Sequence, residues 1–152
     1  MRKPIWSGLV LGALLGCAGP TASTSGDGNP ADTPKALRVT ASPAPKDDIV
    51  IKSLEVQGDT LVTRVMHSGG CKEHTYELLW NGSFQGSETG DSRAELVLAH
   101  DANGDACEAL LNRTVSFDLT PLQRRWRERN KSEHGAVELS FVGSQATARY
   151  AF

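Results

Sequence analysis

Apolar and polar residues alternate through most of residues 48–152, and this alternation limits the possible folds more than any other feature of the sequence. Successive side chains of an extended strand point to opposite faces, so a period of two leaves one face buried and the other in water. The positions that share the core-facing parity are Leu61, Val65 and His67; His74, Tyr76, Leu78 and Trp80; Leu96, Leu98 and His100; Cys107, Ala109, Leu111, Val115, Phe117 and Leu119; Val137, Leu139 and Phe141; and Ala146, Ala148, Tyr150 and Phe152. The pattern predicts about seven short strands in an all-β fold, an antiparallel β-sandwich that is either Ig-like or a small barrel.

Residue pairs typical of tight turns separate the predicted strands, because their types adopt the positive φ angles that hairpins need. These pairs are Gly58-Asp59, Gly69-Gly70, Asn81-Gly82, Asn103-Gly104 and Gly143-Ser144.

One segment breaks the alternation. Thr120-Pro121-Leu122-Gln123 is typical of a capping box with proline at the first helical position, and it predicts one short helix that ends near Asn130.

The N-terminal residues have the pattern of a bacterial lipoprotein signal. Met1-Arg2-Lys3 precedes an apolar run from Ile5 to Leu15 that is too short to span a bilayer, and a cysteine follows small residues at the expected cleavage point. We therefore predict a signal peptide over residues 1–16. The mature chain is expected to start at Cys17, whose thiol takes a diacylglycerol with palmitate-type chains and anchors the protein in the membrane.

Residues 17–47 are predicted to form a flexible linker between the lipid and the domain, because Gly, Pro, Ala, Ser, Thr and Asp predominate there. Leu37 and Val39 are the positions in this linker that could add a short strand to the domain. Ala18 follows the lipidated cysteine, and by resemblance to lipoproteins of double-membraned bacteria the absence of Asp there favours the outer membrane. The predicted location is therefore the cell envelope.

The charge of the mature chain argues against one class of partner. The chain has 16 Lys plus Arg against 18 Asp plus Glu, and loss of Arg2 and Lys3 with the signal would leave a net charge of −4. General nucleic-acid binding needs a basic footprint, so nucleic acid is not an expected partner. Residues 48–152 have the length of one ordinary domain.

Cysteines and histidines gather in two segments of the predicted domain, residues 67–74 and 100–107. Once Cys17 is lipidated, Cys71 and Cys107 are the remaining cysteines. Exported proteins meet an oxidising compartment, so the first interpretation is a disulfide between them. Closing a loop of about 37 residues would stabilise the fold by roughly 4 kcal/mol in the chain-entropy model.

A metal site is the alternative interpretation of the same segments. By the strand assignment above, His67, His74, His100 and Cys107 face the core at strand ends, so they are expected to converge at one rim of the sandwich. Cys71, His74, His100 and Cys107, with His67, would suit zinc or copper; otherwise no cofactor is expected. In a hybrid of the two interpretations the disulfide forms and the histidines alone bind the metal.

Two further possibilities concern catalysis and surface contacts. Cys71 could be a nucleophile with one of the three nearby histidines as its base, but no established catalytic signature supports it and a non-enzymatic role is favoured. The predicted helix carries a basic cluster that could meet lipid phosphates, acidic glycans or envelope proteins, or could be a solvated face. The cluster is Arg124, Arg125, Arg127, Arg129 and Lys131.

A set of short motifs runs through the domain. They are Ser68-Gly69-Gly70-Cys71-x-x-His74-x-Tyr76-x-Leu78, Leu98-x-His100-Asp101, Asp105-x-Cys107, Phe117-Asp118-Leu119-Thr120-Pro121-Leu122 and Tyr150-x-Phe152. With these motifs the chain resembles a group of uncharacterised bacterial lipoprotein domains. The resemblance implies an exported β domain and no particular activity. The leading interpretation is a non-enzymatic binding or structural module of the envelope, and the alternative is a metal-binding protein.

Overall fold

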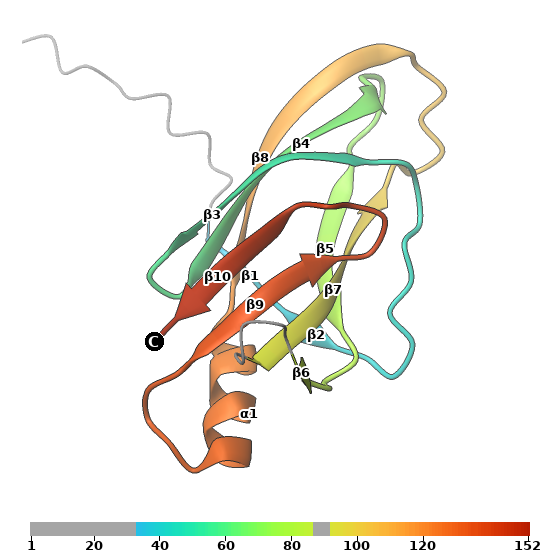
Figure 1. Cartoon of the computed structure of the whole chain (residues 1–152). Helices are drawn as coiled ribbons and strands as arrows, with labels where there is room; N and C mark the ends of the chain where they lie inside the picture. The colour runs from blue at the N-terminus through green and yellow to red at the C-terminus, as the bar shows by residue number, and fades with distance from the viewer. Residues whose placement is uncertain (1–32, 87–91) are drawn as a thin grey trace, which may run out of the picture.

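A computed structural model describes residues 33–86 and 92–152 (Figure 1). The predicted signal peptide, the lipidation site Cys17 and the first half of the predicted linker lie outside these residues. Among the residues described, no helix has the length and apolar character needed to cross a membrane.

Two β-sheets pack face to face and form a sandwich (Figure 1). The strands of the first sheet are, in spatial order, β1 (Lys35–Ala36), β8 (Ala109–Asp118), β4 (Thr60–Gly69) and β3 (Val50–Gln57). Those of the second are β10 (Thr147–Ala151), β9 (Ala136–Phe141), β7 (Ser92–Asp101), β5 (Thr75–Trp80) and β2 (Arg38–Val39), with β6 (Gln85–Gly86) paired to β7. Helix α1 (Thr120–Asn130) lies at one end of the sandwich.

The predicted fold class, a β-sandwich with one short helix, is confirmed. The sheets are mixed where an antiparallel sandwich was expected, because β1 pairs with β8, β2 with β5, and β7 with β9 in parallel. A parallel pair needs a long connection, and between β7 and β9 the chain supplies it by passing through β8 and α1.

Residues 35–39 of the predicted linker contribute the two short strands β1 and β2, one to each sheet. Leu37 lies between them and is 3% exposed, so its side chain packs in the core while the backbone crosses from one sheet to the other. The short strand anticipated at Leu37 and Val39 is therefore present, divided between two sheets.

The core is made by the side chains that the alternation placed inside. Burying each large apolar side chain contributes about 1.5–3 kcal/mol, so this set supplies most of the driving force for folding. The fully buried members are Leu61, Val65, Leu78, Trp80, Leu96, Phe117, Leu119, Val137, Leu139 and Tyr150, and Leu122 of the helix joins them.

The helix is present where the sequence predicted it, but its first cap differs. Leu119 is the N-cap residue and its own side chain makes no capping hydrogen bond, while the Asp118 carboxylate accepts the backbone N–H of Thr120 at 2.9 Å. The Thr120 hydroxyl instead donates to the Asp118 carboxylate at 2.8 Å, so it does not act as the cap of a capping box. Pro121 occupies the first turn as expected, and the completely buried Leu122 ties the helix to the core.

One hydrogen bond with a buried donor residue joins the last strand to the hairpin between β3 and β4. The Tyr150 hydroxyl donates to Asp59 Oδ1 at 2.6 Å, and the side chain of Tyr150 is fully buried. Burial, followed by the hydrogen bond to Asp59, raises the pKa of Tyr150, so the hydroxyl remains a donor across the whole neutral range.

Replacing Tyr150 by Phe should lower the free energy of unfolding by about 1.5–3 kcal/mol, because a hydrogen bond to a charged group is lost. Urea unfolding followed by tryptophan fluorescence measures this. Ser140→Ala is a suitable control, since the Ser140 hydroxyl makes only a 3.5 Å contact with the Ala94 carbonyl. A Tyr150→Phe protein as stable as that control would show that the bond contributes nothing.

Candidate metal-binding site

A disulfide joins Cys71 and Cys107, with their Cα atoms 5.9 Å apart. Cys71 lies in the loop between β4 and β5, and Cys107 in the loop between β7 and β8, so the bond connects the two sheets at one end. Neither sulfur is a thiolate in this form. The cysteines are therefore not available as metal ligands, and Cys71 is not available as a nucleophile.

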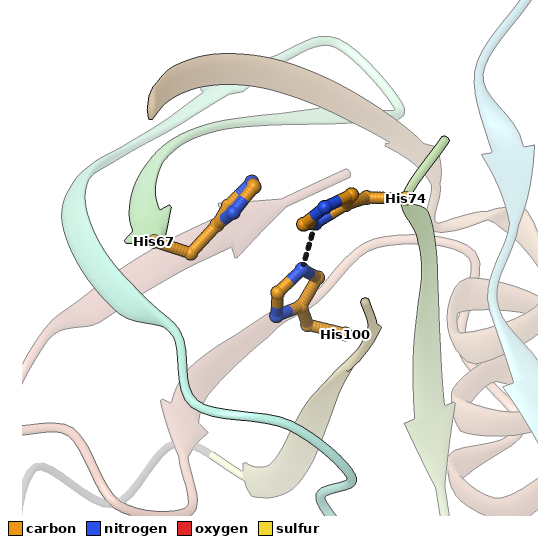
Figure 2. Close-up of side chains that lie close together, drawn as sticks. All are labelled: His67, His74 and His100. Carbon is orange, nitrogen blue, oxygen red and sulfur yellow. Dashed lines mark hydrogen bonds between the residues drawn. The ribbon is translucent and has the colours of Figure 1, made fainter. Parts of the chain in front are cut away.

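Three histidines meet at one end of the sandwich (Figure 2). His67 is near the end of β4, His74 immediately precedes β5, and His100 is near the end of β7. Their ring centroids are 4.2–5.0 Å apart, and one ring nitrogen from each lies within 4.8 Å of the others. The structure thus brings together the three histidines that the parity of the strands placed at one rim.

All three imidazoles are withdrawn from water. The exposed fraction is 5% for His67 and 2% for His100, and 4% for the side chain of His74. Burial lowers the pKa of His100, and the neighbouring His67 and His74 rings lower it further, while its bond to the Asp48 carbonyl opposes them. The cluster therefore disfavours a proton on His100.

Backbone carbonyls fix the tautomers of two of the rings. Nδ1 of His67 is 2.8 Å from the carbonyl oxygen of Ser68, and Nδ1 of His100 is 3.0 Å from that of Asp48. A carbonyl only accepts hydrogen bonds, so each Nδ1 must carry the proton. In the neutral rings, Nε2 of His67 and Nε2 of His100 are then left with bare lone pairs.

The carboxylate of Asp105 fixes the third ring. Its Oδ2 lies 3.1 Å from Nε2 of His74 and also accepts the backbone N–H groups of residues 70–72 at 2.8–3.0 Å. Its Oδ1 accepts the N–H of Cys107 at 3.0 Å. These donors, first Cys107 and then His74, hold the pKa of Asp105 well below its usual range, so the group is ionised and Nε2 of His74 must be the donor. Nδ1 of His74 is left with the lone pair.

Two of the bare nitrogens face each other, and the third faces a hydroxyl group. Nδ1 of His74 is 2.7 Å from Nε2 of His100, a contact between two lone pairs unless a cation lies between them (Figure 2). Nε2 of His67 accepts a hydrogen bond from the Tyr76 hydroxyl at 2.6 Å. Tyr76 is the cross-strand partner of His100, which explains why both side chains point to the same interior.

A glycine allows the close approach of His74. Gly69 ends β4 with φ +140°, and a Cβ atom at this position would overlap the His74 ring. The Gly69-Gly70 pair was predicted as a turn, and the structure shows that its first member also makes room for the histidine. Alanine at residue 69 would be strained and would displace the ring.

Sequence reasoning did not assign Asp105, Tyr76 or Gly69 a role in the histidine cluster. Asp105 stands in the Asp105-x-Cys107 motif and Tyr76 follows the core parity, so both carried a signal that pointed to a role near the cysteines. The carbonyl acceptors of Ser68 and Asp48 carried no sequence signal, because any residue type supplies a backbone carbonyl.

A cavity of about 520 Å³ adjoins the histidines. Both sheets and the loop between β4 and β5 contribute to its wall. Its lining residues are His67, Gly70, Lys72, Glu73, His74, Thr75, Tyr76, Leu111 and Arg113.

Helix α1, which carries most of the basic cluster, lies at the opposite end of the sandwich from the loop between β4 and β5 (Figure 1). Three of the basic residues lie over aromatic rings: Arg125 over Trp80, Arg127 over Phe152 and Arg129 over Phe84, at 5.5–6.0 Å from the ring centroids. Cation–π contacts of this kind each contribute about 0.5–1 kcal/mol at exposed sites. Part of the basic cluster therefore helps to hold the helix on the sandwich.

The fold and the rim define a disulfide-braced β-sandwich domain with a buried histidine cluster. Residues 40–134 match the family described as the NigD-like C-terminal beta sandwich domain, and the chain belongs to this family. The chain matches no curated protein.

Several solved structures are similar to this chain. A protein named as a candidate lipoprotein from Bacteroides fragilis has 12% identity and a TM-score of 0.48 over 78% of this chain and 68% of its own. A NigD-like immunity protein from Bacteroides caccae has 15% identity and a TM-score of 0.49 over 77% of this chain. A protein of unknown function from Bacteroides vulgatus has 20% identity and a TM-score of 0.44 over 78% of this chain. The chain spans only 58% and 55% of the last two proteins.

Replacing both Cys71 and Cys107 by alanine should lower the free energy of unfolding by about 4 kcal/mol, because the unfolded chain regains the entropy that the cross-link removed. Urea unfolding of the full chain in mild detergent measures the difference. The wild-type protein in excess dithiothreitol is the matched control and should be destabilised to a similar extent. A loss below about 1 kcal/mol in both would contradict a bracing role.

Proposed function

We propose that this chain is a lipid-anchored, non-enzymatic protein of the cell envelope that binds a divalent transition-metal ion through His67, His74 and His100. The observation that carries the proposal is that three buried imidazoles bring one ring nitrogen each to within 4.8 Å of the others, while an acceptor beside each ring holds it in place. The lipoprotein-type N-terminus and the disulfide both fit an exported protein. Ala18 after the lipidated cysteine favours the outer membrane.

The donor set suits zinc or copper, which neutral imidazole binds well. Tetrahedral ligands at about 2.0–2.1 Å from the metal are roughly 3.3 Å from each other. The contact of 2.7 Å between His74 and His100 would therefore open slightly on binding. Nε2 of His67 would bind the metal and would no longer accept the hydrogen bond from the Tyr76 hydroxyl.

The partners around the histidines are those of an established type of metal site. Ligating histidines usually donate their other N–H to a carboxylate or a carbonyl, which fixes the ring and raises its basicity. Here His74 has the Asp105 carboxylate, and the other two rings have the carbonyls of Ser68 and Asp48. The negative charge of Asp105 also offsets part of the charge of a buried divalent ion.

Metal content tests the proposal directly. The full chain, purified from an oxidising periplasm in detergent without chelator, should contain about one equivalent of zinc or copper by elemental mass spectrometry. A chelator should remove the metal and lower the unfolding temperature, and adding it back should restore both, because a ligand that binds only the folded state stabilises it.

His100→Gln should weaken zinc binding by more than the roughly 10–100-fold that loss of an outer-shell partner costs, since a ligand itself is lost. His134→Gln is the matched control, because His134 is exposed in the loop before β9 and lies apart from the cluster. Titration calorimetry compares the two variants. Equal affinities would mean that the metal binds elsewhere, and a protein without measurable affinity would make the cluster purely structural.

Asp105→Asn should weaken zinc binding by about 10–100-fold without removing a ligand. His74 would lose the carboxylate that orients its ring and raises the basicity of its ligating nitrogen. Asp101→Asn is the control: Asp101 is also at the end of β7, but its carboxylate pairs with Lys46 at the surface. The same titration measures both variants. An Asp105→Asn protein with the affinity of the control would rule out this role for the carboxylate.

A further inference from the structure

Three protein ligands leave a tetrahedral metal ion with one position for another group. His67 and His74 both line the cavity of about 520 Å³. A ligand could therefore reach the ion from this side. The residues that surround the cavity decide which kind of ligand fits.

Tyr76 is the first of these residues. It is 7% exposed, and its hydroxyl donates to Nε2 of His67 at 2.6 Å. A metal ion on Nε2 uses the lone pair that accepts this bond, so the hydroxyl loses its acceptor. A buried donor needs a new partner, and an oxygen atom on the open position of the metal would supply one.

Arg113 is the second. It lies on β8 opposite Val65 of β4 in the antiparallel register, so it shares the inward parity of that core residue. Leu111, the next inward residue, is opposite His67. Among the residues that the structure describes, Arg113 makes one hydrogen bond, from Nη1 to the carbonyl of Asn112 at 3.1 Å, and no ion pair. Most of its donors are free to bind a ligand.

The other charged groups of the cavity leave it positive. Lys72 directs its ammonium group to the carbonyls of Asn103 and Gly104 at 2.9–3.0 Å, and Glu73 contributes one carboxylate. With Arg113 the lining carries a net charge of +1, before any metal is counted. A guanidinium group matches the paired oxygens of a carboxylate or phosphate.

We propose that the metal-loaded site takes a small anionic ligand, a carboxylate or an inorganic oxyanion, in its open position, with Tyr76 and Arg113 as the residues that bind it. This inference rests on the proposed metal function and names the class of ligand that the same site would hold. The anion oxygen would bind the ion, accept the hydroxyl hydrogen bond of Tyr76 and pair with the guanidinium of Arg113.

Cobalt(II) gives visible absorption bands that depend on its ligands, so it reports on both steps separately. The full chain in detergent is loaded with Co²⁺ and then titrated with sodium acetate and, in a second series, with inorganic phosphate. Sodium chloride at equal ionic strength is the reference. We expect the bands to shift and to saturate with at least one of the two anions and to stay unchanged in the reference.

Arg113→Gln should weaken anion binding about tenfold, which corresponds to the loss of one charge-assisted hydrogen bond. Arg113→Lys, which keeps the charge but not the planar fork, should fall between this variant and the wild type. Tyr76→Phe should also weaken anion binding. Arg124→Gln removes the same charge from the exposed helix at the far end of the molecule and should bind the anion like the wild type.

The outcomes separate the two proposals. Histidine-dependent cobalt bands that neither anion shifts would overturn this inference and leave metal binding intact. A shift that Arg113→Gln and Arg124→Gln reduce equally would overturn the assignment to Arg113. The absence of cobalt bands would overturn both the anion site and the metal site on which it rests.

Discussion

The buried carboxylate of Asp105 is the interaction on which the histidine end of this molecule depends. It accepts N–H groups from residues 70–72 and from Cys107, and it holds His74. An ionised carboxylate without these donors would be very costly in the interior, so its presence dictates the conformation of both loops. The disulfide joins the same two loops covalently. The hydrogen bonds of Asp105 and the disulfide therefore support each other. Together they hold the His74 side chain in place.

The two ends of the sandwich are stabilised by different means. At the helix end, Leu122 is completely buried, Trp126 packs against the core and arginine side chains cover aromatic rings. At the other end, imidazoles occupy positions that would normally hold apolar side chains, and their N–H groups must all find acceptors. This end also carries the disulfide. It is also the end where the chain offers converging lone pairs and a polar cavity.

Much of this arrangement follows from local rules. Alternation assigns each side chain to a face, and turns assign each residue to an end of its strand, so the meeting of His67, His74 and His100 could be predicted from the sequence. The disulfide was the first interpretation of the sequence and is confirmed, because two cysteines remain once Cys17 is set aside for the lipid; the alternation of side chains alone does not give the separation of their Cα atoms. The hydrogen bonds to the carbonyls of Ser68 and Asp48 could not be predicted either, since every residue type has a backbone carbonyl. The predicted capping box did not form, because the Thr120 hydroxyl donates to the neighbouring Asp118 carboxylate and does not cap the helix.

The number of rings at the rim, more than its charge, is what favours the proposed divalent cation over a proton. With the outer nitrogens of His74 and His100 committed as donors, the 2.7 Å contact between their inner nitrogens needs positive charge. A single proton would satisfy these two rings and leave His67 dependent on Tyr76. A metal ion would engage all three rings at once, and its second charge would be opposed by the carboxylate that already lies behind His74. Asp105, which fixes the loops, would thus also lower the electrostatic cost of the proposed ion.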